Sequence, residues 1–237
     1  MVTCEHAGNR IPPEYAHLFR GCDRLLGTHR GYDAGALVMA RTLAASLGAP
    51  LVTSTVSRLL VDLNRSLSNP GAWSEMTRSL STPDKQRIVE RYYAPHQQKV
   101  AAFVDKAVKS GQRVIHIASH SFTPVLNGHV RTADLGLLYD PARRGEAVLA
   151  QYWKAAFAER NPDVRVRRNY PYAGKGDGLT RSLRRRYPHS SYVGIELELN
   201  QAFVEDGGLR WRALRASVVA AFEMALDRLG RAGLVLA

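Results

Sequence analysis

The chain has 237 residues, of which 45% are hydrophobic and 23% charged, and its formal net charge at pH 7 is +12. This composition is ordinary for a globular protein, and a chain of this length can bury its core as a single domain, which we expect over residues 1–237. The apolar runs are shorter than the roughly 20 residues of a membrane helix, and Met1 to His6 does not resemble a signal peptide. We therefore expect a cytoplasmic protein with no membrane partner.

The cysteines and the basic charge narrow the class further. Cys4 and Cys22 are too few for a disulfide framework and suit a reducing compartment. The charge makes a basic nucleic-acid-binding protein without catalysis one alternative. However, the arginines are scattered, with short clusters at 165–168 and 184–186, and no zinc-finger, basic-zipper or aromatic RNA-binding signature accompanies them. We expect no nucleic-acid partner; the charge indicates a solvated surface or an attraction for anionic substrates.

Strand-like and helix-like segments alternate along the chain. Short apolar or β-branched runs predict strands at 2–4, 50–55, 113–118, 132–139, 164–168 and 192–199. Helical spacing of apolar residues predicts helices at 34–47, 83–110, 145–159 and 209–229, with Pro95 breaking or kinking the second. The stretches 66–83 and 170–177 are expected to be loops. The alternation predicts an α/β fold, a mostly parallel central sheet flanked by helices.

Histidines stand at the ends of two expected strands. His6 follows strand 2–4, and His120 follows strand 113–118 between two serines. Ligands of α/β proteins gather beyond the carboxyl ends of the strands, and two histidines with a carboxylate are typical of a catalytic zinc site. One such histidine is more often a hydrogen-bonded structural residue, and the chain has no HExxH or CxxC motif. The two together predict a metal site, for Zn²⁺ or another divalent metal.

Two carboxylates lie in the last expected strand. Glu196 and Glu198 are two residues apart, so both side chains point to the same face. On a face that is normally buried they are costly unless they are paired or linked to a metal. Pairing with arginines, or an edge position for the strand, would explain them structurally. The functional interpretation is that one of them is the general base for a water molecule at the metal.

Further polar groups have two interpretations each. Asp33 directly precedes the expected helix 34–47. It is either the N-cap of that helix or a functional residue, namely a third metal ligand or a residue that orients a ligand. In the group of Asp62, Asn64 and Arg65, the arginine can bind a substrate carboxylate with two nitrogens, or Asp62 can form a structural salt bridge with an arginine. Arg131 precedes strand 132–139 and is a candidate to polarise the scissile carbonyl.

Seven segments in order resemble the N-formylglutamate amidohydrolase family. They are VTCEHAGNRIP (2–12), HRGYDAGA (29–36), SRLLVDLNRS (57–66), HIASHSFTPVLNG (116–128), RTADLGLLYDP (131–141), NYPYAGKGDGLT (169–180) and VGIELELNQ (193–201). The resemblance implies an α/β fold akin to the zinc carboxypeptidases (phosphorylase/hydrolase-like). It also implies zinc-dependent hydrolysis of the amide bond of an N-acyl amino acid such as N-formylglutamate, releasing formate and the amino acid.

The resemblance also implies metal ligands. His6 and His120 fall on the family's histidines, and Asp33 falls on the acidic residue of its helix-start motif. A carboxypeptidase-type His-x-x-Glu pair would need an acid at position 9, where this chain has Asn9. The third ligand is therefore expected to be Asp33, with Glu5 as the alternative.

Roles in the reaction follow in the same way. Glu198 falls on the acidic residue of the family's E-x-N strand, and Glu196 is the alternative because the ELEL repeat permits either register. The family's DLNR element falls on Asp62, Asn64 and Arg65. Arg131 would steady the oxyanion, and Arg65 or Arg181 would bind the α-carboxylate of the product. A carboxypeptidase-like enzyme, another N-acyl-amino-acid deacylase and an inactive protein of the same fold remain alternatives.

Overall fold

The computed structural model describes residues 1–231, and its centre is a six-stranded sheet with the order β2-β1-β3-β8-β6-β7. The strands are β1 (Val2–Cys4), β2 (Leu51–Thr53), β3 (Val114–Phe122), β6 (Leu135–Leu138), β7 (Val166–Arg168) and β8 (Tyr192–Asn200). β2, β1, β3 and β8 run parallel to one another, whereas β6 is antiparallel to β8 and parallel to β7. The predicted α/β fold with a mostly parallel sheet is confirmed.

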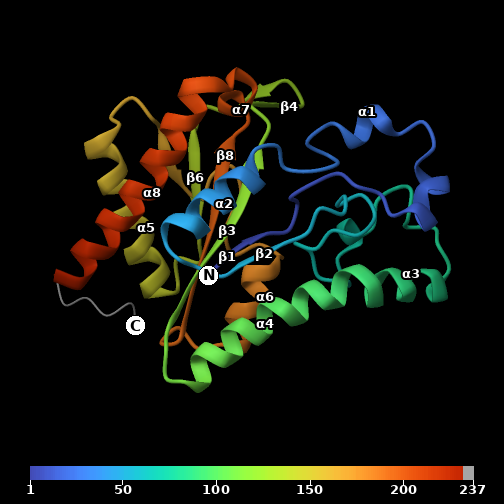
Figure 1. Cartoon of the computed structure of the whole chain (residues 1–237), viewed down its shortest axis with the longest axis horizontal. Helices are drawn as coiled ribbons and strands as arrows, with labels where there is room; N and C mark the ends of the chain where they lie inside the picture. The colour runs from blue at the N-terminus through green and yellow to red at the C-terminus, as the bar shows by residue number, and fades with distance from the viewer. Residues whose placement is uncertain (232–237) are drawn as a thin grey trace.

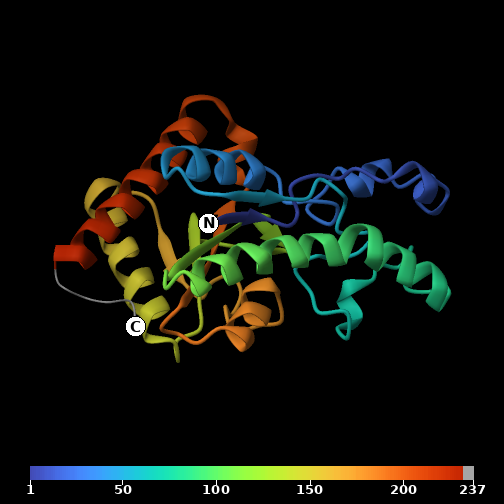
Figure 2. The same cartoon turned by 60° about the horizontal axis from the view of Figure 1, so that its bottom comes forward.

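Helices cover both faces of this sheet (Figures 1 and 2). α2 (Ala36–Ser46), α5 (Arg144–Arg160) and α8 (Gly208–Arg231) share the largest apolar core with one face. α4 (Ala94–Lys109) and α6 (Leu179–Arg186) pack against the other face. The short helix α7 (Ala202–Asp206) follows β8. Among residues 1–231, no helix is both long and apolar enough to cross a membrane.

A second apolar cluster lies beside the sheet, in the part of the molecule that holds α1 and α3 in Figure 1. It is built from the 3-10 helix η1 (Pro13–Phe19) with α1 (Asp23–Leu26), α3 (Thr82–Ile88) and the irregular segment 56–63. Trp73, which follows the 3-10 helix η2 (Pro70–Ala72), packs against this cluster. Leu60 and Ile88 are fully buried at its centre. The cluster holds in place the segment that carries Arg58, Asp62 and Asn64.

The predicted helix 83–110 consists of three pieces. α3 is followed by a π-helical turn, η3 (Val89–Tyr93), and then by α4. The backbone is helical on both sides of Pro95, which lies two residues after the end of the π-helical turn. A proline within a helical run removes a hydrogen bond to the preceding turn and its ring crowds the carbonyl four residues earlier, so the irregular turn lies where Pro95 would distort the helix.

Three local features differ from the sequence prediction. β3 runs on to Phe122, so His120 lies inside the strand and not after it. Helix α6 follows the loop at 170–177, where no helix was predicted. An antiparallel hairpin of β4 (Val125–Leu126) and β5 (His129–Val130) turns at Asn127 and Gly128, which have φ of 51° and 79°. The Asn-Gly pair is a strong hairpin signal, because both residues tolerate positive φ.

Candidate active site

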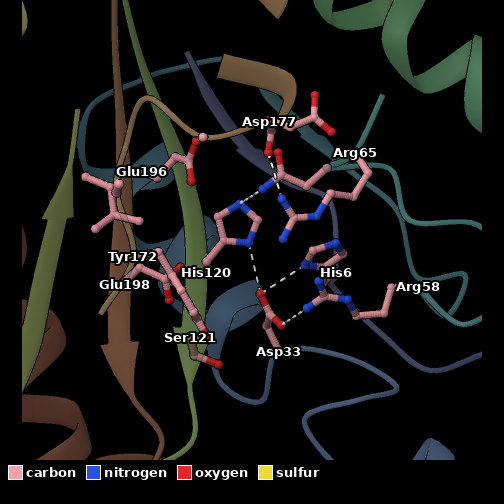
Figure 3. A pocket seen from close by; sticks show the side chains of 14 residues that line it. His6, Asp33, Arg58, Arg65, His120, Ser121, Tyr172, Asp177, Glu196 and Glu198 are labelled. Carbon is pink, nitrogen blue, oxygen red and sulfur yellow. Dashed lines mark hydrogen bonds and ion pairs between the residues drawn. The ribbon is translucent and has the colours of Figure 1, made fainter. Parts of the chain in front are cut away.

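A cavity of about 170 Å³ lies at the carboxyl ends of β1, β3 and β8 (Figure 3). Its size suits a small metabolite, since pockets for drug-sized ligands are about 300–1,000 Å³. The lining side chains are His6, Asp33, Arg58, Asn64, Arg65, His120, Ser121, Leu138, Tyr172, Ala173, Gly176, Asp177, Glu196 and Glu198.

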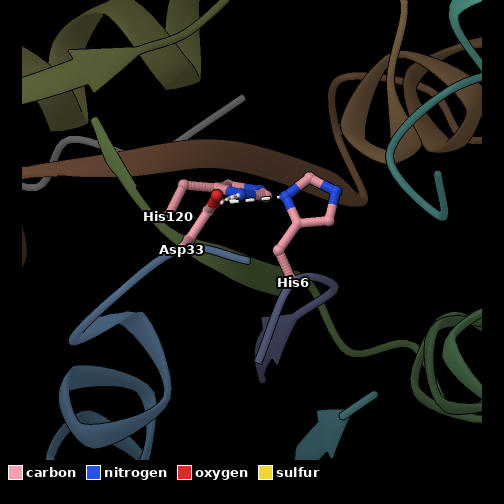
Figure 4. A group of neighbouring side chains, drawn as sticks. All are labelled: His6, Asp33 and His120. Carbon is pink, nitrogen blue, oxygen red and sulfur yellow. Dashed lines mark hydrogen bonds and ion pairs between the residues drawn. The ribbon is translucent and has the colours of Figure 1, made fainter. Parts of the chain in front are cut away.

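Two histidines and one aspartate converge in this cavity (Figure 4). Asp33 Oδ2 is 3.1 Å from His6 Nδ1 and 2.9 Å from His120 Nδ1. All three side chains are buried, and one ligand atom from each lies within 4.8 Å of the others. Bonds of about 2.0–2.2 Å from zinc to such atoms place ligands roughly 3.4 Å apart in a tetrahedral site. A small adjustment of the trio would therefore admit a metal ion.

The local backbone explains why these residues meet. The amide of Asp33 donates to the carbonyl of His6 at 3.0 Å, which joins the end of β1 to the segment before α2. Hydroxyl groups of β3 fix the same segment, because Ser119 donates to the carbonyl of Ala36 and Ser121 to that of Ala34. Asp33 is therefore held next to His120 by hydrogen bonds on both sides of that histidine.

The other ring nitrogen of each histidine faces a buried carboxylate. His6 Nε2 lies 2.7 Å from Asp62 Oδ1, and His120 Nε2 lies 3.1 Å from Glu5 Oε2, although the second contact is poorly aligned for a hydrogen bond. A carboxylate at this position keeps the proton on Nε2 and leaves the Nδ1 lone pair free for a metal. His6 therefore has the surroundings of a metal ligand, and those of His120 are similar except that its Nε2 also lies 3.4 Å from Asn64 Nδ2.

The charges around the two rings leave a place for a cation. Glu5, Asp33 and Asp62 are buried carboxylates, and Arg58 contacts the two aspartates at 3.3 and 2.7 Å. One guanidinium against three carboxylates leaves a surplus of two negative charges. Two imidazolium rings or one divalent cation would balance that surplus, so the electrostatics fit a metal as well as the geometry does.

Without a metal, the surplus of negative charge raises the pKa values of both histidines. Burial and the Arg58 charge oppose protonation of His6, but Asp62 and Asp33 outweigh them and raise its pKa. Burial likewise opposes protonation of His120, whose pKa is nevertheless raised well above its usual value by Asp33 and Glu5. A bare Nδ1 lone pair beside the Asp33 carboxylate would be repulsive, so each ring must hold either a proton or a cation there.

A third histidine, His96, also contacts Glu5. Glu5 is fully buried, and its Oε1 lies 3.5 Å from Nε2 of His96, which belongs to α4. Burial by itself would raise the pKa of Glu5, but the adjacent rings of His120 and His96 hold it well below its usual value. Through His96 and Glu5, helix α4 contributes to the surroundings of His120.

Glu196 and Glu198 both face the cavity, as their spacing in the sequence predicts (Figure 3). β8 lies between β3 and β6, so an edge position does not explain them. The Thr180 hydroxyl donates to Glu196 Oε1 at 2.5 Å, whereas the buried Oε2 of Glu198 has no hydrogen-bond partner within residues 1–231. Burial raises the pKa of Glu198 to about 8.

The residues predicted to contact the substrate lie in different parts of the structure. Asn64 and Arg65 line the cavity; Asn64 Oδ1 accepts from the amide of Leu179, and Arg65 Nη1 donates to the carbonyl of Asp177. Arg131 does not line it, but donates to the hydroxyl of Tyr172, which does.

Arg181 is in α6 and lines a neighbouring pocket instead. Of the arginines singled out from the sequence, only Arg65 therefore reaches the cavity of the two histidines.

Several lining or supporting residues could not be singled out from the sequence. Arg58 lies in the segment SRLLVDLNRS but shows no pattern that separates it from other arginines. Its position four residues before Asp62, an Arg-Asp spacing that brings side chains together in one helical turn, is the only signal. His96 is far from the other residues in sequence, and Tyr172 and Asp177 lie in a glycine-rich loop that was predicted without a function.

The sheet, with a histidine–carboxylate cluster at its carboxyl edge, defines an α/β protein with a candidate metal site. The chain belongs to the N-formylglutamate amidohydrolase family, whose model matches residues 1–204. The resemblance noted in the sequence is thereby confirmed, and family membership makes the chain a hydrolase. No curated protein sequence matches it significantly.

Two solved structures show the same fold. A gene product from Agrobacterium tumefaciens matches with a TM-score of 0.84 and 28% identity, over 97% of this chain and 91% of the other. An N-formylglutamate amidohydrolase from Ralstonia eutropha matches with a TM-score of 0.70 and 18% identity, over 97% and 94%. At the lower identity the likeness shows the fold alone.

Proposed function

We propose that this chain is a metal-dependent amidohydrolase that cleaves the amide C–N bond of a small N-acyl amino acid, with N-formylglutamate as the model substrate. The products are then formate and the amino acid. The observation that carries the proposal is the convergence of His6 Nδ1 and His120 Nδ1 on Asp33 Oδ2, in a small cavity that also contains Glu198. Family membership supports the reaction class.

His6, His120 and Asp33 would hold the metal, and Zn²⁺ is the first candidate for two imidazoles and a carboxylate. Glu5, the alternative third ligand, contacts His120 through Nε2, the nitrogen that faces away from Asp33. It is therefore better placed to orient His120 than to bind the same ion. A bound divalent cation supplies Lewis acidity, which polarises a carbonyl oxygen and makes water acidic enough to attack near pH 7.

Glu198 is the proposed general base. Its pKa of about 8 lies close to neutral pH, where a carboxyl group can both accept and return a proton. Its unpartnered Oε2 is available to take a proton from the attacking water and later to give it to the leaving amine. Glu196 already accepts a hydrogen bond from Thr180, so it is the weaker candidate for the base.

Arg65 and Asn64 are the proposed substrate-binding residues. Arg65 lines the cavity and uses Nη1 on a neutral carbonyl, so its positive charge is available to a substrate carboxylate. The amide of Asn64 is oriented by its hydrogen bond with Leu179. Arg131 is proposed to act through Tyr172, on whose ring its guanidinium stacks at 5.1 Å, and to position that hydroxyl at the cavity.

The test is a hydrolysis assay combined with metal analysis. The purified chain should contain close to one divalent metal per molecule, lose activity after chelation and regain it with Zn²⁺. A panel of N-formyl, N-acetyl and N-succinyl derivatives of glutamate and leucine identifies the acyl group and the amino acid. The cavity of about 170 Å³ predicts a preference for formyl, the smallest acyl group. Full activity after complete removal of the metal would refute metal dependence. Faster turnover of the larger acyl groups would instead favour another N-acyl-amino-acid deacylase.

A further inference from the structure

A second cavity of about 290 Å³ adjoins the candidate active site, and arginines dominate its lining. Arg181, Arg185 and Arg186 come from α6, and Arg65 comes from the segment after β2. Arg65 and Asp177 line both cavities, so their side chains form part of the wall between them. We call this second cavity the arginine pocket.

Three of the four arginines of helix α6 line this pocket. Leu179, Leu183 and Arg184 are buried on the side toward the sheet, where Arg184 is paired with Glu146 at 2.9 Å. Arg181 and Arg185 are four residues apart, so they lie next to each other on the pocket side. Like charges at this spacing repel each other, and the arrangement gains stability when an anion lies between them.

The positive charge of the pocket is only partly balanced. Arg186 is paired with Asp105 at 2.5 Å, and Arg65 donates to a backbone carbonyl, which carries no full charge. Within residues 1–231, Arg181 and Arg185 form no ion pair with a carboxylate. Against four guanidinium groups, the carboxylates of Asp177 and Asp105 leave a surplus of two positive charges.

Asp177, the one acidic side chain in the lining among residues 1–231, is hydrogen-bonded to other partners. Asp177 Oδ2 accepts hydrogen bonds from the amide of Ser66 at 2.9 Å and from Asn69 Nδ2 at 2.8 Å. Its carboxylate is therefore used to hold the loop after Arg65. The N-terminus of α6, whose amides carry partial positive charge, also borders the pocket at Gly178 and Leu179. The Leu179 amide already donates to Asn64 Oδ1, so the donors available to an oxyanion in the pocket are the guanidinium groups of Arg181 and Arg185.

We propose that the arginine pocket is a binding site for a small oxyanion, a phosphate or carboxylate group, separate from the cavity of His6 and His120. Arg181 and Arg185 bind the anion directly, and the charge of Arg65, in the shared wall, adds to the positive potential of the pocket. The site does not depend on the proposed hydrolysis, because its ligand contacts no member of the histidine cluster.

The test is calorimetric titration of the full chain with inorganic phosphate and, separately, with glutarate. The test variant is R181Q/R185Q, whose two side chains line the arginine pocket and not the active-site cavity. The matched control is R20Q/R24Q, which removes two exposed arginines at the same spacing on another part of the surface. An unchanged melting temperature shows that each variant is folded, and R185Q alone, at an exposed position, provides a milder second variant.

We expect saturable binding of at least one anion to the wild type, weakened about tenfold or more in R181Q/R185Q and by less than about twofold in the control. Tighter binding of phosphate identifies a phosphate ligand, and tighter binding of glutarate identifies a carboxylate. Equal weakening in both double variants would show a general charge effect and overturn the site. So would the absence of saturable binding of either anion to the wild type.

Discussion

His116 and His120 lie on the same face of β3, four residues apart, and both are buried, yet their surroundings are opposite. His116 lies between two neutral groups, with Nε2 2.8 Å from the Thr3 hydroxyl and Nδ1 2.7 Å from that of Tyr192. His120 lies between two carboxylates. Burial lowers the pKa of His116 to about 3, whereas the carboxylates raise that of His120.

The neighbouring strand contributes to this contrast. In the register of β3 with β8, His116 is opposite Gly194 and His120 is opposite Glu198. A Cβ at Gly194 would come within 2.7 Å of the Tyr192 hydroxyl, so glycine leaves room for the group that binds His116. Residue type and burial are thus the same at both histidines, and the charge of the contacting groups decides which one is suited to a metal.

Replacing each histidine with asparagine tests this contrast directly. H120N removes one of three proposed ligands, so we expect loss of the bound metal and a fall in kcat/KM of about ten-thousandfold or more, since Lewis acidity supplies several kcal/mol. H116N loses hydrogen bonds to Thr3 and Tyr192 and is expected to be less stable but to keep its metal. Metal content and kcat/KM of the folded fraction are the measurements. An H120N protein that keeps both its metal and its activity would remove His120 from the site.

The two glutamates of β8 offer the next largest effect. E198Q keeps the shape of the side chain but cannot accept a proton, so kcat should fall at least about a hundredfold while the metal remains bound. E196Q is the matched variant at the other position facing the cavity, and a smaller fall is expected because Thr180 already occupies that carboxylate. A larger loss in E196Q would exchange the roles of the two residues.

Glu5, whose carboxylate contacts His120, is expected to affect the affinity for the metal and not the reaction itself. E5Q removes a buried negative charge 3.1 Å from His120 Nε2, and such outer partners are worth about 10–100-fold in metal affinity. Competition with a chelator of known affinity measures the change. E75Q, which removes an exposed carboxylate paired with Arg30, is the control and should change the affinity by less than about twofold. Equal affinities for E5Q and the wild type would assign Glu5 to folding alone.

The sequence predicts much of the site because parallel strands share one carboxyl edge. His6 follows β1 and His120 lies in the last part of β3, two residues before its end, so their meeting at the carboxyl edge could be predicted. The two-residue period places Glu196 and Glu198 on one face. These inferences need only the direction and period of the strands. The antiparallel direction of β6 does not follow from them, since its four residues carry the same apolar pattern in either direction.

Other parts of the site depend on contacts that no local pattern encodes. Arg58 is in an irregular segment and reaches Asp33 and Asp62 only because the second apolar cluster fixes that segment. His96 meets Glu5 through the packing of α4 on the sheet. Helix α6 is short and rich in arginine, so only Leu179 and Leu183 indicate its buried side. As a result the sequence could not separate Arg65, at the cavity, from Arg181, in the arginine pocket.

The pH dependence of stability should show the smallest effect, and it isolates His116. Its pKa is about 3 in the folded chain and about 6.5 when unfolded, so only the unfolded chain takes up this proton between pH 6.5 and 3. Stability is therefore complete above pH 6.5 and is lost as the pH falls toward 3. From pH 7 to 5.5 the loss of stability from this one group is about 1 kcal/mol.

Urea unfolding of wild type and H116Q at pH 7 and pH 5.5, in the same metal state, measures this loss. H116Q should lose about 1 kcal/mol less than the wild type, because the titrations of His6 and His120 cancel in the comparison. Equal losses in the two proteins would mean that His116 is not held neutral, and the contrast between the two histidines of β3 would then disappear.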